Sequence, residues 1–141
     1  MKRYLLDTTP LSAYLNGLAA AVQRIDPWIM RDEVATSVLV YAEVLEGLHS
    51  RSRFPERHQQ LKEVLKYVYP FWLTYPILER YASMRRQLRP PHGPGLIGDI
   101  DTLIAATALE RNLTVVTCDE DYKRVPGLKT IVIPRGEFRR S

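Results

Sequence analysis

Short apolar runs alternate with helix-like segments along most of this chain, and that alternation limits its fold more than any other feature. The apolar runs predict strands at Arg3 to Leu6, Glu33 to Ser37, Phe71 to Tyr75, Leu113 to Thr117 and Lys129 to Ile133. Segments with apolar residues at helical spacing lie between most of these runs. Strands that alternate with helices indicate a mainly parallel sheet flanked by helices.

The expected helices follow from the same periodicity and from capping residues. They are a helical region that runs to about Met30, then Val38 to His49 with Ser37 as its cap, Pro55 to Tyr69, Ile77 to Leu88, and Leu103 to Leu109. The run Pro90 to Gly98 is rich in proline and glycine and therefore predicts a loop. Because this loop is short and an apolar helix follows it, we expect it at the rim of a site rather than at a domain boundary.

The length of 141 residues is typical of one domain, so we expect a single domain over residues 1–141, with a flexible tail at 135–141. The single cysteine, Cys118, excludes an intramolecular disulfide and fits a reducing compartment. The start of the chain reaches Asp7 too early for a signal peptide, and no apolar stretch approaches the length of a membrane span. We therefore expect a cytoplasmic protein.

Four acidic residues stand where expected strands end or on the helices that follow: Asp7, Glu43, Asp101 and Asp119. The carboxyl ends of parallel strands share one edge of a sheet, so these side chains are expected to meet in one pocket. Carboxylates held close together repel one another unless a cation or protons intervene. Hard oxygen ligands suit Mg²⁺ or Mn²⁺, and the pattern therefore indicates a divalent metal site.

Taken singly, each acid also has a structural explanation, because an acid near a helix start caps the helix or interacts with its dipole, which contributes about 1 kcal/mol. Asp99 and Asp101 would point about 200° apart on a regular helix, so only one of them can face the pocket squarely. We favour Asp101, with Asp99 as a cap or a supporting residue. Two further acids are candidates for the same pocket, with solvent-facing positions as the alternative: Glu46 and Asp121.

The charge balance favours an anionic partner. The chain has 20 lysines and arginines against 16 acids, and its net charge is +4. If four acids gather in one pocket, the remaining surface is more basic than this sum implies, which suits a phosphate backbone. Two basic clusters are candidates for such contact, with a solvated helix face as the alternative for each: Arg51, Arg53, Arg57 and His58, and Arg85, Arg86, Arg89 and His92.

Four sequence blocks around the acids resemble the PIN-domain ribonucleases, especially the VapC toxins of bacterial and archaeal toxin-antitoxin pairs. The blocks are LLDT at Asp7, YAEVLEGL at Glu43, IGDIDTLIAATAL at Asp101 and VVTCDEDYKRVPGL at Asp119. They occur in the order of the family and extend from about residue 2 to residue 133. The blocks at Asp101 and Asp119 are the more specific ones.

The resemblance implies a PIN-like three-layer α/β/α sandwich with a central, mainly parallel sheet of four to five strands. It also implies an endoribonuclease that cleaves single-stranded or loop regions of RNA with Mg²⁺ or Mn²⁺. Asp7 and Asp101 would be the principal metal ligands, and Glu43 and Asp119 would complete the site directly or through bound water. Each of these four positions matches the acidic quartet of the family.

The same resemblance implies that Thr117 and Thr8 orient the acids. It further implies a homodimer and a cognate antitoxin whose carboxyl-terminal segment covers the groove. The apolar stripes Leu11 to Leu15 and Leu18 to Val22 are candidates for either contact, with core packing as the alternative. The chain departs from the commonest pattern by carrying extra carboxylates, which leave open whether Asp99 or Asp101, and Asp119 or Asp121, binds the metal.

Two other functions remain open. A haloacid-dehalogenase-type phosphatase uses an aspartate after the first strand as its nucleophile and expects a second acid two residues later, where this chain has Thr9. A non-catalytic PIN-like module would bind RNA without cleaving it, and metal-dependent turnover separates that module from a nuclease. Other candidate residues are weak: the histidines show no metal-ligand spacing and are expected at the surface, and Cys118 and Tyr122 are expected to pack.

Overall fold

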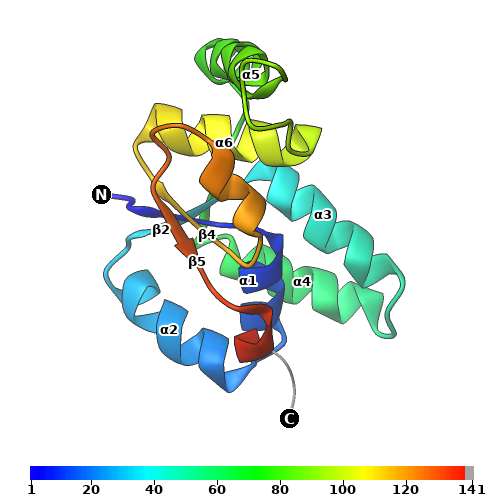
Figure 1. The fold of residues 1–141 in the computed structure, drawn as a ribbon. Helices are drawn as coiled ribbons and strands as arrows, with labels where there is room; N and C mark the ends of the chain where they lie inside the picture. Colours follow the sequence, from blue (N-terminus) through cyan, green and yellow to red (C-terminus); the bar gives the residue numbers. More distant parts are fainter. Residues whose placement is uncertain (139–141) are drawn as a thin grey trace.

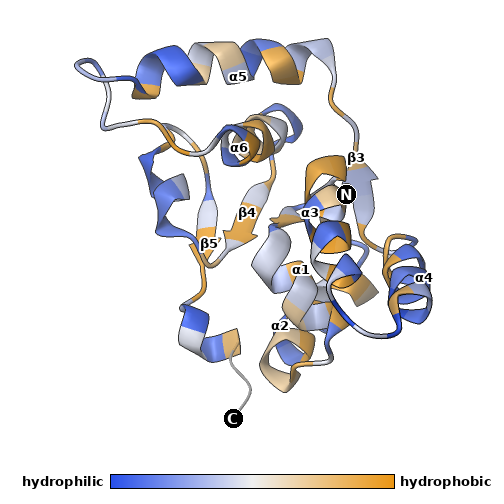
Figure 2. Ribbon diagram, turned by 90° about the vertical axis from the view of Figure 1, so that its right-hand side faces the viewer, coloured by the Kyte–Doolittle hydropathy of each residue, from blue (hydrophilic) through white to orange (hydrophobic). Residues whose placement is uncertain are grey.

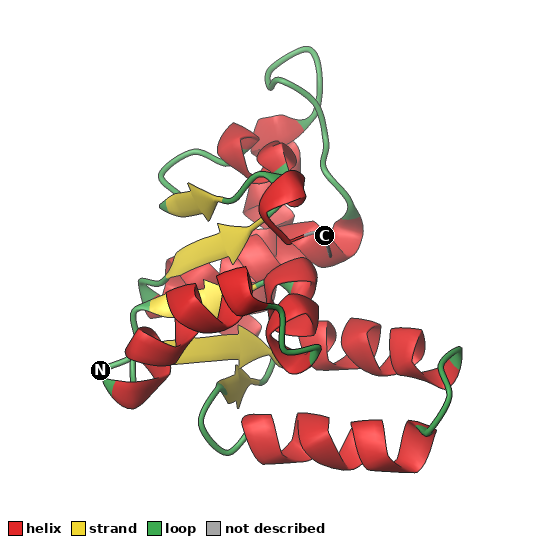
Figure 3. Ribbon diagram, turned by 90° about the horizontal axis from the view of Figure 1, so that it is seen from below, coloured by secondary structure: helices red, strands yellow, loops and turns green. Residues whose placement is uncertain are grey.

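Five strands form one parallel sheet at the centre of the protein (Figure 1). The structure is a computed structural model and describes residues 1–138. The strands are β1 (Tyr4–Leu6), β2 (Val34–Ser37), β3 (Tyr69–Phe71), β4 (Thr114–Thr117) and β5 (Thr130–Val132). Every pairing between neighbours is parallel, and all the arrows in Figure 3 point the same way. The expected parallel sheet is confirmed.

Helices cover the sheet on both sides, which gives the expected three-layer α/β/α sandwich (Figure 3). They are α1 (Thr8–Leu15), α2 (Ala19–Met30), α3 (Val38–His49), α4 (Phe54–Val64), α5 (Tyr75–Leu88) and α6 (Asp99–Arg111), with short 3-10 helices η1 (Glu120–Arg124) and η2 (Arg135–Phe138). Helix α5 packs on α6 and lies farther from the sheet than α6 does (Figure 2).

The central strands are buried on both faces, which explains their continuous apolar sequences. Leu5 and Leu6 of β1 and Val115 and Val116 of β4 are all fully buried. Burial of such side chains stabilises the fold by about 1.5–3 kcal/mol each. The two central strands therefore lie in the core, and the residues that directly follow them lie at its edge.

The order of the sheet is β3-β2-β1-β4-β5, so the chain builds outward from β1 first in one direction and then in the other. In the register of the central pair, Leu6 lies opposite Val116. A change of direction of this kind leaves a crevice beyond the carboxyl ends of the two central strands, where open α/β sheets bind their ligands. Asp7 and Asp119 follow these strand ends.

Three of the expected elements have the wrong bounds. The helical region expected up to Met30 is divided into α1 and α2, because Gly17 has a left-handed backbone with φ of 71° that ends the first helix. The strand expected at Phe71 to Tyr75 lies earlier, at Tyr69–Phe71, and the helix before it ends at Val64. Pro70 is tolerated in β3 because this edge strand pairs only with β2 and needs no N–H on its outer side.

Leu11, in the first of the apolar stripes on the early helices, is fully buried in the core. Leu15, Leu18 and Val22 are half-buried. The expected flexible tail begins with η2, where Glu137 forms an ion pair of 3.0 Å with Arg24, while residues 139–141 lie outside the described part of the chain. None of the helices in residues 1–138 is long and apolar enough to cross a membrane.

Candidate active site

Two of the four acids follow the central strands directly. Asp7 comes immediately after β1 and occupies the position before α1, and its backbone N–H donates to the Val116 carbonyl at 2.9 Å. Asp119 comes two residues after β4 and caps η1. Because β1 and β4 are neighbours, both acids reach the same crevice.

Asp7 is a buried carboxylate held by a buried hydroxyl. The Thr117 side chain donates to Oδ2 of Asp7 at 2.7 Å, and the backbone N–H of Asp119 donates to the same Thr117 hydroxyl at 3.0 Å. Burial raises the pKa of Asp7, and the charge of Glu43 adds to that rise, while the hydrogen bond from Thr117 and the backbone N–H of Thr8 oppose it. The site thus holds an acid whose charge the surrounding protein does not neutralise.

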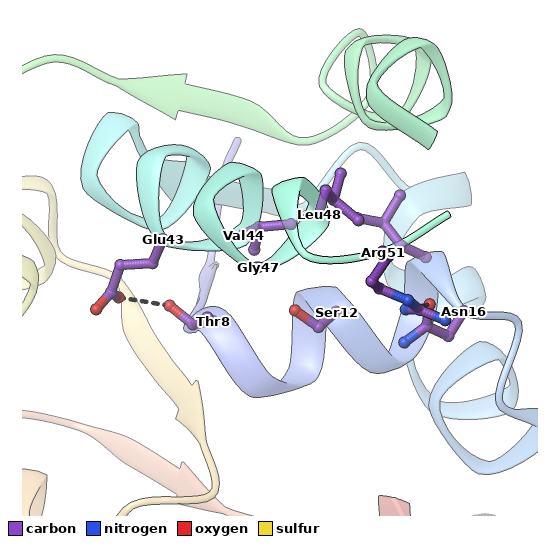
Figure 4. A pocket seen from close by; sticks show the side chains of 9 residues that line it. Thr8, Ser12, Asn16, Glu43, Val44, Gly47, Leu48 and Arg51 are labelled. Atoms are coloured by element: carbon purple, nitrogen blue, oxygen red, sulfur yellow. Dashed lines mark hydrogen bonds between the residues drawn. The ribbon is translucent and has the colours of Figure 1, made fainter. Parts of the chain in front are cut away.

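Glu43 reaches the crevice from α3. That helix begins after β2, where the buried Ser37 side chain accepts a hydrogen bond of 3.1 Å from the N–H of Leu39. Glu43 lies on the side of α3 that faces α1, and the Thr8 hydroxyl donates to its Oε1 at 2.6 Å (Figure 4). The capped helix therefore brings this carboxylate to Thr8, the residue that directly follows Asp7.

The two aspartates at the start of α6 have different surroundings. Asp101 is half-buried and its Oδ1 accepts a hydrogen bond of 3.1 Å from the hydroxyl of Tyr122. The Asp99 side chain is 71% exposed and forms an ion pair of 2.6 Å with Arg85. Helix geometry separates the two side chains, as expected from their spacing, and brings Asp101 to the other acids.

Asp119 and Asp121 also differ. Asp119 accepts a hydrogen bond of 2.9 Å from the backbone N–H of Asp121, whereas the carboxylate of Asp121 lies 3.4 Å from Arg124. Glu46, the other candidate acid, is exposed on α3. Asp119 therefore belongs to the cluster. Asp121 instead pairs with Arg124, and Glu46 is exposed to solvent.

The four acids interact electrostatically. Burial, together with the charges of Asp7, Asp119 and Glu43, raises the pKa of Asp101 to about 6, although the hydrogen bond from Tyr122 opposes this rise. In the described residues, no lysine, arginine or histidine forms an ion pair with any of the four. The cluster is therefore a concentration of negative charge that the rest of residues 1–138 leaves unpaired.

No group of three or more histidine, cysteine, aspartate and glutamate side chains in residues 1–138 is drawn together tightly enough to hold a metal ion as it stands. Uncharged donors surround these carboxylates. Three of them accept a hydroxyl: Asp7 from Thr117, Glu43 from Thr8, and Asp101 from Tyr122. The donor set consists only of carboxylate oxygens and uncharged groups, and it fits a hard divalent cation.

A groove of about 220 Å³ leads away from the cluster between α1 and α3. Figure 4 shows Glu43 and Thr8 at one end, and Asn16 and Arg51 at the other. The guanidinium of Arg51 donates to the amide oxygen of Asn16 at 2.8 Å, and it has no acidic partner among the described residues. The groove thus joins the acidic cluster to a fixed positive charge.

Sequence patterns did not single out all of these residues. Tyr122 was expected only to pack, yet its buried hydroxyl contacts the cluster. Its position three residues after Asp119 was the available signal. Asn16 carried no signal, and Arg51 was one member of a basic cluster. His58, expected at the surface, is half-buried and shares a hydrogen bond of 2.9 Å with Tyr41, whereas Cys118 is buried as expected.

Comparison with known proteins places this geometry in a family. The family model of the PIN domain matches residues 4–128, which include all four acids. This chain belongs to the PIN-domain family. No curated protein matches the sequence at a significant level.

Solved structures share the fold of this PIN domain over nearly its whole length. VapBC2 from Rickettsia felis, bound to a DNA fragment from its promoter, is 22% identical, with a TM-score of 0.80, and the match covers 92% of this chain and 98% of the other. FitAcB from Neisseria gonorrhoeae is 25% identical, with a TM-score of 0.76 and coverages of 91% and 96%. DNA-bound VapBC from Salmonella typhimurium is 18% identical, with a TM-score of 0.80 and coverages of 94% and 98%.

Proposed function

We propose that this PIN domain is a metal-dependent endoribonuclease and the toxin of a toxin-antitoxin pair. It would hydrolyse RNA phosphodiester bonds with Mg²⁺ or Mn²⁺ held by Asp7, Glu43, Asp101 and Asp119. The observation that carries this proposal is the meeting of four carboxylates, without a cationic partner in residues 1–138, at the carboxyl ends of the two central strands.

Charge explains why such a pocket needs a cation before it accepts RNA. Asp101 repels Asp7, Glu43 and Asp119, and all four would repel a phosphate. A divalent cation offsets both repulsions. We therefore expect the metal-free protein to be inactive and to bind RNA weakly.

The chain's own groups can supply the remaining parts of a hydrolysis. When bound, a divalent cation lowers the pKa of an attacking water and offsets the charge that develops on the phosphate. By their likeness to the acidic quartet of the family, Asp7 and Asp101 would hold the cation, and burial raises the pKa of both carboxyl groups. Oε1 of Glu43 is fixed by Thr8, so Oε2 is the atom that would position the attacking water and accept its proton.

The groove between α1 and α3 provides a path for the RNA strand. It extends about 12 Å from Thr8 to Asn16, at the rise of an α-helix, which is long enough for more than one nucleotide. The hydroxyl of Ser12 and the amide of Asn16 line it, and Arg51 stands at its far end. Arg51 would bind a phosphate away from the cleaved bond.

The solved neighbours support a protein partner. They include VapBC structures and a toxin-antitoxin complex from Klebsiella pneumoniae. We infer that a cognate antitoxin also binds this chain and that the free toxin is a homodimer. Sedimentation of purified protein, with and without its antitoxin, would test both assemblies.

Incubation of antitoxin-free protein with total cellular RNA would test the nuclease. Wild type, Asp101→Asn and Asp99→Asn are compared in Mg²⁺, Mn²⁺ and EDTA. We expect discrete cleavage that needs metal, a loss on the order of 100-fold or more in Asp101→Asn, and wild-type cleavage in Asp99→Asn, because Asp99 pairs with Arg85 outside the cluster.

Two outcomes would contradict the proposal. Equal cleavage by wild type and Asp101→Asn would mean that a contaminant or another site cuts the RNA. RNA binding by wild type without any metal-dependent cleavage would favour the non-catalytic module instead. Discrete products would also give the sequence and structure of the preferred RNA.

A further inference from the structure

The buried hydroxyl of Tyr122 donates a hydrogen bond to one of the four carboxylates and interacts with a second. Tyr122 belongs to η1, which follows Asp119, and its side chain is fully buried. Its hydroxyl donates to Oδ1 of Asp101 at 3.1 Å. It also interacts with Asp7, where it opposes the rise in pKa that burial causes. One side chain thus interacts with acids that come from two different parts of the chain, the end of β1 and the start of α6.

We propose that Tyr122 is a positioning residue for the metal, because its hydroxyl holds the carboxylate of Asp101 beside Asp7 before the cation arrives. This inference rests on the proposed function, since it assumes that these two acids bind the cation. Tyr122 itself would not bind the metal. It would act through the acids, as the outer partners of metal ligands commonly do.

Packing alone does not account for the hydroxyl. The aromatic ring is enclosed by core residues, and a phenylalanine would bury the same apolar surface without placing an oxygen there. A buried hydroxyl destabilises the fold unless it is hydrogen-bonded. Its hydrogen-bond partner in residues 1–138 is the carboxylate of Asp101.

The charge of the hydrogen-bond donor also matters for a metal site. A lysine or arginine between Asp7 and Asp101 would neutralise them and occupy the place of a cation. A tyrosine hydroxyl is uncharged at neutral pH, so it fixes the carboxylates and leaves their negative charge available. Each donor also occupies only one oxygen: Tyr122 occupies Oδ1 of Asp101, and no side chain in residues 1–138 donates to Oδ2.

The rest of the cluster follows the same pattern. Thr117 fixes one oxygen of Asp7, Thr8 fixes one oxygen of Glu43, and the backbone N–H of Asp121 fixes one oxygen of Asp119. For Asp101, the Tyr122 hydroxyl is the side-chain donor that the described residues provide. Loss of this hydroxyl would leave the half-buried Asp101 carboxylate free to turn away from Asp7, whose charge repels it.

Mn²⁺ binding without RNA would test this role. The free Mn²⁺ ion is counted by its electron paramagnetic resonance signal during titration of wild type, Tyr122→Phe and Tyr81→Phe. We expect Tyr122→Phe to raise the dissociation constant about tenfold. Tyr81→Phe is the matched control, because its hydroxyl donates at 3.3 Å to Asp99, outside the cluster, and we expect it to bind Mn²⁺ as wild type does.

A second readout separates positioning from catalysis. All four acids remain in Tyr122→Phe, so saturating Mn²⁺ should restore most of the RNA cleavage rate, with the defect confined to the Mn²⁺ concentration required. Urea unfolding of the metal-free variants shows whether the fold is intact. A lasting loss of cleavage at saturating Mn²⁺ would overturn the proposal, because Tyr122 would then act in the chemical step.

The outcomes distinguish this inference from the proposed function. Wild-type Mn²⁺ affinity in a folded Tyr122→Phe protein would overturn the role of Tyr122 alone and leave the nuclease intact. A Tyr122→Phe protein that loses its fold would overturn it too, since the hydroxyl would then serve folding. A wild-type protein that neither binds Mn²⁺ nor cleaves RNA would overturn both.

Discussion

Asp101 makes the metal-free fold sensitive to pH. Its pKa is raised from 3.8 to about 6, chiefly by burial, so the folded chain binds more protons than the unfolded chain between these values. The contribution of Asp101 to the free energy of unfolding is therefore fully present below about pH 4 and is lost as the pH rises through about 6. At neutral pH the charged Asp101 destabilises the metal-free protein.

We expect Asp101→Asn to remove this dependence. In EDTA at pH 7.5 the variant should be more stable than wild type by on the order of 1–2 kcal/mol, a value reduced because Asp101 is only half-buried. The difference should be small at pH 4. Urea unfolding at both pH values measures it, and saturating Mg²⁺ should reverse the order at pH 7.5. If the variant were no more stable than wild type at pH 7.5, charged Asp101 would not destabilise the metal-free protein, and this explanation would be wrong.

Spacing in the sequence predicted that Asp99 and Asp101 face different surroundings, but it did not predict their hydrogen-bond partners. The 3.6-residue period sets Asp99 and Asp101 on different sides of α6, and that part follows from spacing alone. Tyr122 is one of eight tyrosines, and only the tertiary fold brings its hydroxyl to Asp101. Side-chain partners that come from distant segments leave no periodic signal in the chain.

Two glycines, one just after α1 and one inside α3, have opposite roles. Gly17 ends α1 with φ of 71°, a conformation that strains other residues, whereas Gly47 lies inside α3. An added Cβ meets no atom within 4 Å at either position. Backbone conformation alone should therefore decide the effect of alanine.

We expect Gly17→Ala to destabilise the protein by about 1 kcal/mol, because alanine disfavours a positive φ. We expect Gly47→Ala to stabilise it by about 0.5–1 kcal/mol, because alanine is the better helix former. Urea unfolding of the two variants measures both shifts. Destabilisation by Gly47→Ala would show that α3 tolerates no added methyl group beside the groove.

Elements with strong local signals were predicted from the sequence, and those set by tertiary context were not. The apolar strand that became β4 and the helix capped by Ser37 follow from local patterns. Edge strand β3 was placed too late, because Pro70 argues against a strand unless its outer side is known to be unpaired. Local patterns do not show which strand lies at an edge.

Charge is unevenly distributed over the whole molecule. Four of its 16 acids gather at the crevice, so the remaining surface is more basic than the net charge of +4 suggests. Arg51 brings positive charge to the groove that starts at this crevice. An RNA strand would thus meet a cation at the cluster and an arginine at the far end of the groove.

We expect Arg51→Ala to weaken the binding of single-stranded RNA and to make it less sensitive to salt. The slope of log affinity against log salt concentration should fall by about 0.7, the value for one phosphate contact on a single strand. Fluorescence anisotropy in Ca²⁺ at several salt concentrations measures this slope. Lys62→Ala removes the same charge from exposed α4 and serves as the control. An unchanged slope in Arg51→Ala would place the RNA outside the groove.

The order of the strands explains why the four acids meet. The alternating pattern predicted a parallel sheet, but the position of β1 between β2 and β4 is a tertiary property. That position brings Asp7 beside Asp119 and within reach of Glu43 and Asp101. Convergence of the acids was an expectation from the general rule for open sheets, and the observed strand order supplies its physical basis.

The location of the metal is the most direct measurement. Crystals of the wild-type protein and of Asp101→Asn are soaked in Mn²⁺, and anomalous diffraction is recorded at the manganese absorption edge. We expect a strong anomalous peak beside the carboxylates of Asp7 and Asp101 in wild type, and none there in Asp101→Asn. A manganese ion bound elsewhere, or an equal peak in the variant, would contradict a metal centre built from these acids.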